Sequence, residues 1–359
     1  MNRRSNFNLD WGLLVPVLVL LTFSLTVLFT MDMSLFRSQL LFSVVGFLAF
    51  LFFSQTNLKT VRFYSVPIYV VSIILLIIVL LLGVETRGSV RWLDFFGFGL
   101  QFSELLKPFL AISLAAFLSS RNNYSFKTLL LATAFLLPVV ILVFLQPDLG
   151  NALIYLMAAV IAFLVFGFPF RYFLSGLAFL AVSSPILWGL LHDYQRHRIL
   201  TFLNPNDPLG LSYNAIQSVI AVGSGMLFGR GLGLGTQSGL RFLPERHTDF
   251  IFATLSEELG MVGAFLIIMT FIFLLYKIFV IFKEQDDMFN KIYAAIVFSV
   301  IFLQFFVNIG MNIGLLPIVG ITLPFVSYGG SSLLSNLIFL GILSSMAKND
   351  SSHKVLEIK

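Results

Sequence analysis

The sequence predicts an all-α, polytopic integral membrane protein with about ten transmembrane helices and one long extracytoplasmic loop. Of its 359 residues, 58% are apolar and only 11% are charged, whereas soluble domains contain about 25% charged residues. The apolar residues gather in runs of about 20, which is the length of a helix that crosses a bilayer. A soluble domain of this size would need a charged surface, so the runs must face lipid. A soluble globular protein is therefore excluded.

Ten apolar runs define the predicted spans. The first follows Arg3 and Arg4 as the core of a signal peptide would, but it is long enough to span and no small-x-small cleavage site follows it, so we expect a retained helix. We expect a single membrane domain over residues 1–359, without internal repeats. The ten runs are residues 11–30, 37–54, 66–84, 104–120, 127–145, 149–167, 172–191, 249–282, 292–312 and 324–346.

The basic residues predict the orientation in the membrane. An even number of spans places both termini on one side. Thirteen of the 22 Lys and Arg residues lie at the two ends and in alternate loops, and only four lie in the short loops opposite. Because basic residues are concentrated on the cytoplasmic side of membrane proteins, we expect a multi-pass membrane protein with both termini cytoplasmic. The basic residues form no continuous stripe, so no nucleic-acid partner is expected.

The long loop, at about residues 192–248, lies between spans seven and eight and is predicted to be a folded extracytoplasmic cap. Residues 213–222 are apolar enough for a helix that lies on or dips into the membrane. Seven glycines occupy residues 223–239. They match neither a dinucleotide fingerprint nor a P-loop, because no strand precedes them and no Gly-Lys-Ser/Thr follows. Two interpretations remain, a tight turn at the membrane surface or a backbone that approaches a diphosphate.

Ionisable residues inside or at the rim of a span indicate function, because lipid makes them costly. Glu104 and Lys107 lie three residues apart on one helix face. In one interpretation the two residues form an ion pair that allows the fourth span to insert. In the other, Lys107 offers a cation to an anionic substrate and Glu104 orients Lys107. The two interpretations are compatible. Asp148 follows Pro147 at the start of the sixth span. It is either a helix cap or a substrate contact.

Asp249 opens the eighth span beside Arg246 and His247, and its position fits a helix cap as well as a catalytic base. Glu257 and Glu258 lie about two turns further on and are interpreted as structural partners of buried cations. Ser327 begins a run of small residues that serves close helix contacts or a ligand. The histidines lack the spacing of a zinc site, and the chain has no cysteine.

Several segments, in order, resemble the SEDS family (shape, elongation, division and sporulation) over essentially the whole chain. The stretch from His192 to Arg198, and Arg246 ahead of His247, resemble the rod-shape member more than the division member. Phe102 replaces a usual Pro, which alters the kink ahead of the fourth span, and Met226 replaces a frequent Gly. The matching segments are Arg91-Trp92, Phe102-Ser103-Glu104 with Lys107, Gln146-Pro147-Asp148-Leu149-Gly150, the run from Leu243 to Phe250, and the run from Leu323 to Ser332.

The resemblance implies a peptidoglycan glycosyltransferase of the bacterial cytoplasmic membrane. Its expected role is to polymerise lipid II, the undecaprenyl-diphosphate-linked disaccharide-pentapeptide, for cell elongation and rod shape. The resemblance also implies a class B penicillin-binding protein and other elongation-machinery membrane proteins as partners, and Asp249 as the essential carboxylate. A β-linkage made from an α-diphosphate requires inversion, so we expect Asp249 to act as a base. A divalent cation, Mg²⁺ or Mn²⁺, is expected to assist the diphosphate, and its ligands are not assignable. Substrate contacts are expected from Arg91, Glu104, Lys107, Asp148, Gln195, Arg198, Arg246, His247 and Ser327.

The alternative function is a transporter that flips lipid II across the membrane, since it would need similar rim cations and intramembrane carboxylates. A flippase must serve both leaflets. The singled-out groups Arg91, Glu104, Asp148, Arg198 and Asp249 all fall at outer ends of spans or in outer loops, and this favours the enzyme.

Overall fold

The computed structural model describes residues 10–86, 89–95, 98–191, 193–203, 212–240 and 242–356. In this part of the chain, eight helices are long and apolar enough to cross a membrane, and two shorter apolar helices coincide with the fourth and seventh predicted spans. Every predicted span therefore corresponds to a helix. The eight are α1 (Trp11–Met31), α2 (Met33–Phe53), α4 (Ser65–Leu82), α7 (Phe126–Leu145), α8 (Leu149–Phe166), α13 (Ile251–Glu284), α14 (Met288–Asn312) and α15 (Gly330–Leu356), and the two are α6 (Lys107–Ser119) and α9 (Phe170–Leu190).

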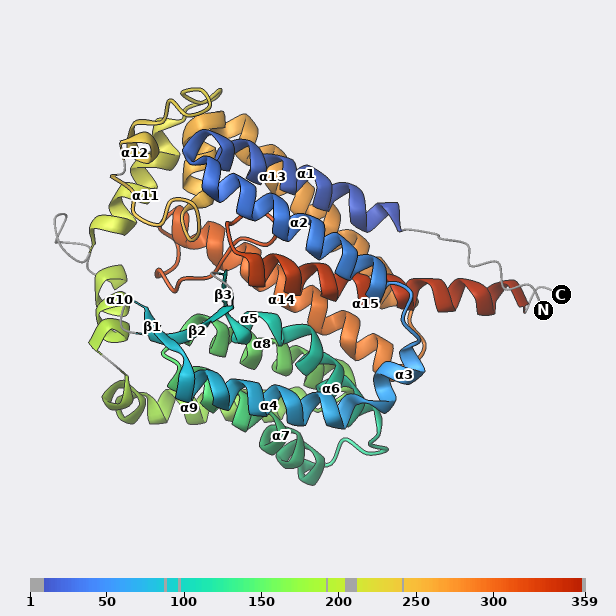
Figure 1. Cartoon of the computed structure of the whole chain (residues 1–359). Helices are drawn as coiled ribbons and strands as arrows, with labels where there is room; N and C mark the ends of the chain where they lie inside the picture. The colour runs from blue at the N-terminus through green and yellow to red at the C-terminus, as the bar shows by residue number, and fades with distance from the viewer. Residues whose placement is uncertain are drawn as a thin grey trace.

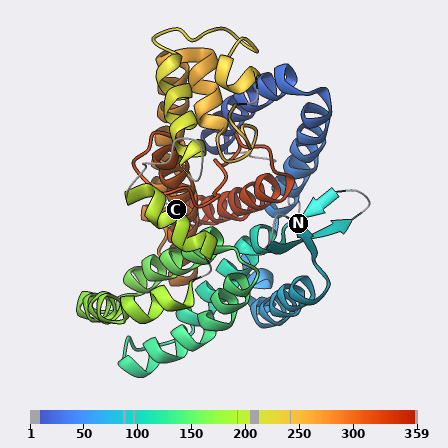
Figure 2. The same ribbon diagram turned by 90° about the vertical axis from the view of Figure 1, so that its left-hand side faces the viewer.

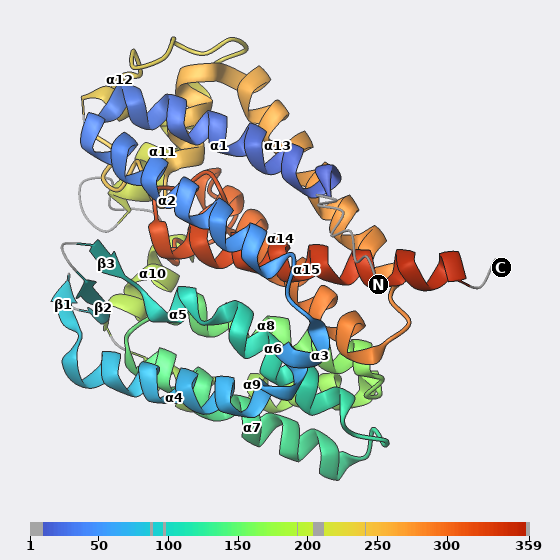
Figure 3. The same ribbon diagram turned by 45° about the vertical axis from the view of Figure 1, so that its right-hand side comes forward.

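The helices α14 and α15 form the centre of the bundle. They lie between α1, α2 and α13 on one side and α4, α6, α7, α8 and α9 on the other (Figures 1 and 3). Helix α14 packs against α6, α8 and α13, and α15 packs against α2. The main apolar core joins α1, α6, α8, α13, α14 and α15. The central helices carry buried polar side chains, as several of their neighbours do, whereas α4 and α7 present most of their surface outward.

The functional loops gather at one end of the bundle, opposite the start of α1 and the end of α15 (Figure 1). Viewed end-on, this end carries a small antiparallel sheet and the helices of the long loop (Figure 2). The predicted helix at residues 213–222 is present as α11 and packs on α13 and α14. The elements here are β1 (Val84–Thr86), β2 (Ser89–Phe95), β3 (Phe98–Leu100), α5 (Phe102–Leu105), α10 (Asp193–Leu203), α11 (Tyr213–Ser224) and α12 (Thr236–Gly239), and the small α3 (Leu58–Phe63) lies at the other end.

Two features of the fold differ from the predictions. The sheet at residues 84–100 was not predicted, because its strands are short and follow an apolar span directly. The last span begins at Gly330 and not at residue 324. Phe325 has a positive φ of 63°, and its side chain is buried in the core with Val326. These apolar residues therefore fill a tight turn and do not extend the helix.

The glycine-rich segment is held against a kink in α13. Gly260 has non-helical torsion angles inside this helix, which leaves neighbouring backbone groups without helical partners. The segment supplies those partners: the N–H groups of Met261 and Val262 donate to the carbonyls of Met226 and Leu227 at 2.8 and 3.1 Å. In return the N–H groups at positions 230 and 231 donate to the carbonyls of residues 257 and 258. The segment therefore turns tightly against α13, and its approach to a diphosphate stays a prediction.

Replacing Gly229 by Ala should destabilise the protein strongly. Gly229 has φ of 81°, and a Cβ there would overlap the carbonyl of Glu258. The left-handed conformation alone costs about 1–2 kcal/mol for an L-residue, and the overlap adds to it. The matched control is Gly223→Ala, because a Cβ at Gly223 in α11 meets no atom within 4 Å and Ala favours a helix. Thermal unfolding of the two purified variants checks this, and equal melting temperatures would contradict it.

Candidate functional site

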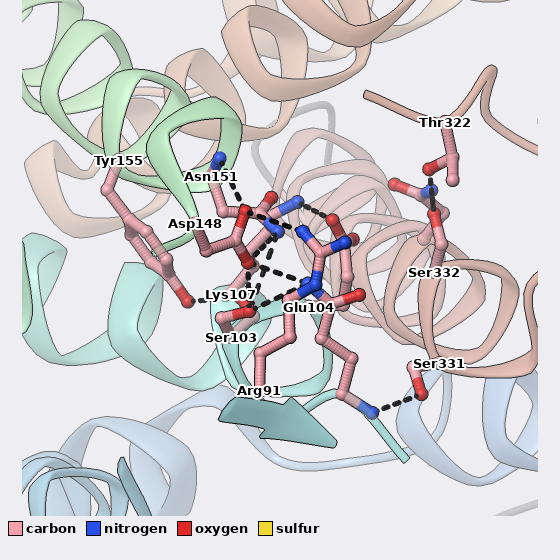
Figure 4. Close-up of polar contacts among 12 residues, drawn as sticks. Arg91, Ser103, Glu104, Lys107, Asp148, Asn151, Tyr155, Thr322, Ser331 and Ser332 are labelled. Carbon is pink, nitrogen blue, oxygen red and sulfur yellow. Dashed lines mark hydrogen bonds and ion pairs between the residues drawn. The ribbon is translucent and has the colours of Figure 1, made fainter. Parts of the chain in front are cut away.

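Asp148 is the centre of a buried polar network at the functional end. It is the N-cap of α8, and its Oδ1 accepts a hydrogen bond from the backbone N–H of Asn151 at 3.3 Å. Its Oδ2 accepts from Gln101 Nε2 at 2.6 Å, from Ser103 Oγ at 2.8 Å and from Asn151 Nδ2 at 2.9 Å. Figure 4 shows Ser103 and Asn151 beside the Asp148 carboxylate. The prediction of a helix cap is confirmed, and the cap also joins the fourth and sixth spans.

Arg91 presents a cation at the surface of this network. It lies on β2, with NH1 3.9 Å from Asp148 Oδ1, and its side chain is 31% exposed against 3% for Asp148. The sheet thus positions a guanidinium next to a buried carboxylate (Figure 4), and the Arg91 side chain stays partly exposed. An arrangement of this kind can bind a phosphate oxygen, because the guanidinium offers several N–H donors.

Glu104 and Lys107 form the predicted ion pair. Lys107 Nζ lies 2.8 Å from Glu104 Oε1, and the two side chains are only 2% and 8% exposed. Lys107 also borders a cavity of about 30 Å³ with apolar walls from α6, α7, α8 and α14. Tyr155, which lines the same cavity, donates its hydroxyl to the carbonyl of Ser103 at 2.9 Å. The pair is confirmed as an ion pair, and contact between Lys107 and a substrate stays a prediction.

Asp249 lies in the turn that leads into α13, with Phe250 as the N-cap residue of that helix. Its side chain is half-buried. Gly320 lies beside both Asp249 and Arg198: a Cβ on Gly320 would lie 3.5 Å from Asp249 Oδ2 and 3.8 Å from Arg198 NH1. Because residue 320 is glycine, the space over its Cα, which we call the gap, holds no side chain of this residue. A carboxylate and a cation that face one gap can serve a proton transfer beside an anionic leaving group.

A groove of about 720 Å³ opens next to this gap. It runs between α10, α11 and residues 314–318, and its wall combines polar groups with apolar side chains. The polar ones are His197, Arg198, Thr201 and Asn214, and the apolar ones include Phe202, Val219, Ile220, Leu316, Pro317 and Ile318. The groove can therefore hold an amphiphilic molecule beside Arg198.

The remaining predicted residues hold the turn around Asp249 or lie at its edge. Ser327 Oγ donates to the carbonyl of Thr248 at 2.7 Å and accepts from the N–H of Leu323 at 2.8 Å. His247 stacks obliquely on Tyr328, with ring centroids 5.6 Å apart. Arg246 is half-buried in the same turn. Gln195 lies in α10, and its side chain is outside the described part of the chain. Their contacts with a substrate stay predictions.

The expectation that Glu257 pairs with a buried cation is wrong. Its carboxylate accepts from the backbone N–H groups of Gln237 and Ser238 at 2.8 and 2.9 Å, and from Thr236 Oγ1 at 3.2 Å. It therefore holds the first turn of α12, where free N–H groups favour an anion. Glu258, in contrast, is within electrostatic reach of Arg246.

Sequence reasoning missed several uncharged polar residues. Gln101, Asn151 and Tyr155 complete the Asp148 network, and Asn308 and Asn312 of α14 bind the backbone of Asp249. The two asparagines did leave a signal, because amides four residues apart share one face of an apolar helix. Within the described residues there is no group of three or more His, Cys, Asp or Glu side chains that could hold a metal ion.

The family model described as cell cycle protein, for FtsW, RodA and SpoVE, matches residues 6–352. The chain belongs to this family. The resemblance to the SEDS proteins is thereby confirmed. Among relatives of the FtsW/RodA/SpoVE family, the peptidoglycan glycosyltransferase MrdB of Escherichia coli K12 is 36% identical over 94% of this chain and 93% of its own length. The stage V sporulation protein E of Bacillus subtilis is also 36% identical, over 94% of this chain and 97% of its own length.

Solved structures agree with this assignment. A chain from work on the structural coordination of polymerization and crosslinking by a peptidoglycan synthase complex matches with a TM-score of 0.83 and 30% identity, over 95% of this chain and 98% of that chain. The rod shape determining protein RodA of Thermus thermophilus matches with a TM-score of 0.73 and 28% identity, over 95% and 97% of the two chains. The predicted multi-pass helical fold is thus confirmed.

Proposed function

We propose that this protein is a peptidoglycan glycosyltransferase that polymerises lipid II for cell elongation and rod shape. Its relatives in the FtsW/RodA/SpoVE family include proteins named peptidoglycan glycosyltransferase, at 36% identity over most of the chain. The observation that carries the proposal is the half-buried Asp249, which lies with Arg198 beside Gly320 and next to the groove that Arg198 lines. This pairs a base with a cation for a diphosphate, as glycosyl transfer from a lipid diphosphate requires.

The proposed reaction is one in-line displacement. The 4-hydroxyl of an incoming lipid II attacks C1 of the reducing-end sugar on the growing chain, and the new O–C1 bond forms as the bond from C1 to the diphosphate oxygen breaks. The hydroxyl proton passes to the Asp249 carboxylate, and undecaprenyl diphosphate leaves. Inversion at C1 converts the α-diphosphate into a β-linkage without a covalent enzyme intermediate.

The leaving diphosphate requires positive charge. Arg198 borders the gap at Asp249, and Arg91 presents the half-exposed guanidinium over Asp148. A divalent cation, Mg²⁺ or Mn²⁺, is part of the proposal. Its ligands are not assigned; in phosphate sites Mg²⁺ takes one or two carboxylates and fills its remaining positions with phosphate oxygens and water. When bound, it would stabilise charge on the diphosphate.

A lipid II flippase is the competing function. It would need polar groups along a path between both leaflets. The described groups that we assign to the site instead lie at one end of the bundle, on the sheet, at the start of α8, on α10 and in the turn before α13 (Figure 1). This distribution supports the enzyme.

The test is polymerisation by the purified protein. It should convert lipid II into glycan chains in the presence of Mg²⁺ or Mn²⁺, and more efficiently with a class B penicillin-binding protein, the partner that we propose because a matching structure comes from a peptidoglycan synthase complex. Transfer of lipid II between leaflets of a vesicle without chain formation would favour the flippase.

The active site is proposed to face outward, with both termini cytoplasmic. The chain has no cysteine, so single-cysteine variants report the side directly. A membrane-impermeant maleimide added to intact spheroplasts should label Leu240→Cys, at the exposed end of α12, and not Asn122→Cys, in the exposed loop between α6 and α7. The reverse labelling pattern would contradict the orientation.

A further inference from the structure

Three consecutive backbone carbonyls, those of residues 247–249, accept hydrogen bonds from other parts of the chain. The carbonyl of His247 accepts from the N–H of Tyr328 at 2.8 Å, and that of Thr248 accepts from Ser327 Oγ at 2.7 Å. The carbonyl of Asp249 itself accepts two hydrogen bonds, from Asn308 Nδ2 and Asn312 Nδ2, both at 3.0 Å. The two amides come from successive turns of α14. Consequently the backbone of Asp249 is anchored to the central helix of the bundle.

Asn312 also completes the start of α13. The N-cap residue of that helix, Phe250, makes no side-chain capping bond. Asn312 Oδ1 instead accepts from the N–H of Ala253 at 3.1 Å, and from Ser218 Oγ of α11 at 3.3 Å. A first-turn N–H of α13 is therefore satisfied from a neighbouring helix. Asn312 thus joins α11, α13 and α14 at one point.

Asn308 links Asp249 to the opposite wall of the gap. Its Nδ2 donates to the carbonyl of Ile321 at 2.7 Å as well as to that of Asp249. Ile321 follows Gly320, the residue that lies beside both Asp249 and Arg198. One buried amide therefore sets the spacing between the carboxylate and the loop it faces. Both asparagines are fully buried, so they cannot touch a substrate in the groove.

We propose that Asn308 and Asn312 are positioning residues that direct the Asp249 carboxylate through its backbone. This rests on the proposed function of Asp249 as the base. A preorganised group loses much of its effect when it shifts, because a displacement of about 1 Å can cost about 100-fold in rate. The amides keep Asp249 in place although it lies in a turn outside α13.

The test compares substitutions on one face of α14. At a temperature where the variant is fully folded, Asn308→Ser should lower kcat by about 10- to 100-fold while KM for lipid II changes little, and Asn312→Ser should act in the same direction. The matched control is Gln304→Leu, one turn earlier, because Gln304 is fully buried and its amide has no hydrogen-bond partner among the described residues. This variant should keep the kcat of the parent protein.

Two results would overturn the proposal. One is a folded Asn308→Ser protein with unchanged kcat. The other is a kcat that falls only as the melting temperature and the bound partner fall, since that is the behaviour of a purely structural residue. Asn308→Leu is the second variant, because it keeps nearly the size of the side chain and removes the N–H donors without burying a charge. It should lower kcat at least as far as Asn308→Ser.

A readout independent of polymerisation separates this proposal from the proposed function. In the cysteine-free chain, Asp249→Cys gives a single thiol whose alkylation rate reports its placement. Adding Asn308→Ser should change that rate several-fold, and adding Gln304→Leu should not. If the alkylation rate changes but the parent protein does not polymerise lipid II, the positioning role is supported and the proposed enzymatic function is rejected. An unchanged rate would reject the positioning role.

Discussion

Replacing Asp249 by Asn should abolish polymerisation while the protein remains inserted, folded and bound to its partner. The amide has nearly the shape of the carboxylate but cannot accept the proton of the attacking hydroxyl. Asp249 precedes the N-cap of α13, and its backbone carbonyl carries the bonds from α14, so these contacts survive the change. General-base assistance is worth about 10²–10⁴-fold, and a lost contact to the diphosphate or its cation would add to that.

The measurement is chain elongation from lipid II by the purified variant, together with its melting temperature and its capture of the penicillin-binding protein. The control is Asp94→Asn, which neutralises an exposed carboxylate on β2 at the same end of the bundle and should leave elongation unchanged. Near-normal elongation by folded Asp249→Asn would remove this residue from the mechanism. Glu257 would not replace it as a base, because three donors already occupy its carboxylate.

The spans were predictable because lipid imposes one strong requirement, an apolar run of fixed length. The same rule could not find the sheet at residues 84–100, whose few residues alternate too briefly to be read as strands. It also placed the start of the last span too early. Pro324, Phe325 and Val326 are apolar, but they fill the core from a tight turn, and composition does not distinguish a helix from a buried turn.

The charged residues of the site were predictable for a related reason. A charge near lipid is costly, so its presence indicates a function. Only the fold brings Arg91 next to Asp148, and Arg198 near Asp249. The members of each pair lie about 50 residues apart in the chain. The uncharged amides at positions 308 and 312 were not singled out, because an amide costs less in an apolar helix than a charge does. Their role depends on contacts with a carbonyl that no sequence pattern records.

Removing the charge of Lys107 should destabilise the protein as well as inactivate it. Lys107→Met leaves the buried carboxylate of Glu104 without its cation. Breaking a buried ion pair from one side costs about 3–5 kcal/mol, so the melting temperature should fall clearly. The contrasting control is Arg62→Met, which breaks an exposed pair with Asp287 at 3.6 Å and should cost less than about 1 kcal/mol.

Exchanging the two residues, with Glu104→Lys and Lys107→Glu in one protein, separates stability from function. The exchange restores opposite charges three residues apart on α5 and α6, so the melting temperature should recover much of the loss. Polymerisation should not recover if the cation at position 107 serves the substrate, because the exchange moves positive charge from the cavity side of the pair toward Ser103 and Asp148. Full activity of the exchanged protein would reduce the pair to a structural role, and the diphosphate would then depend on Arg91, Arg198 and a divalent cation.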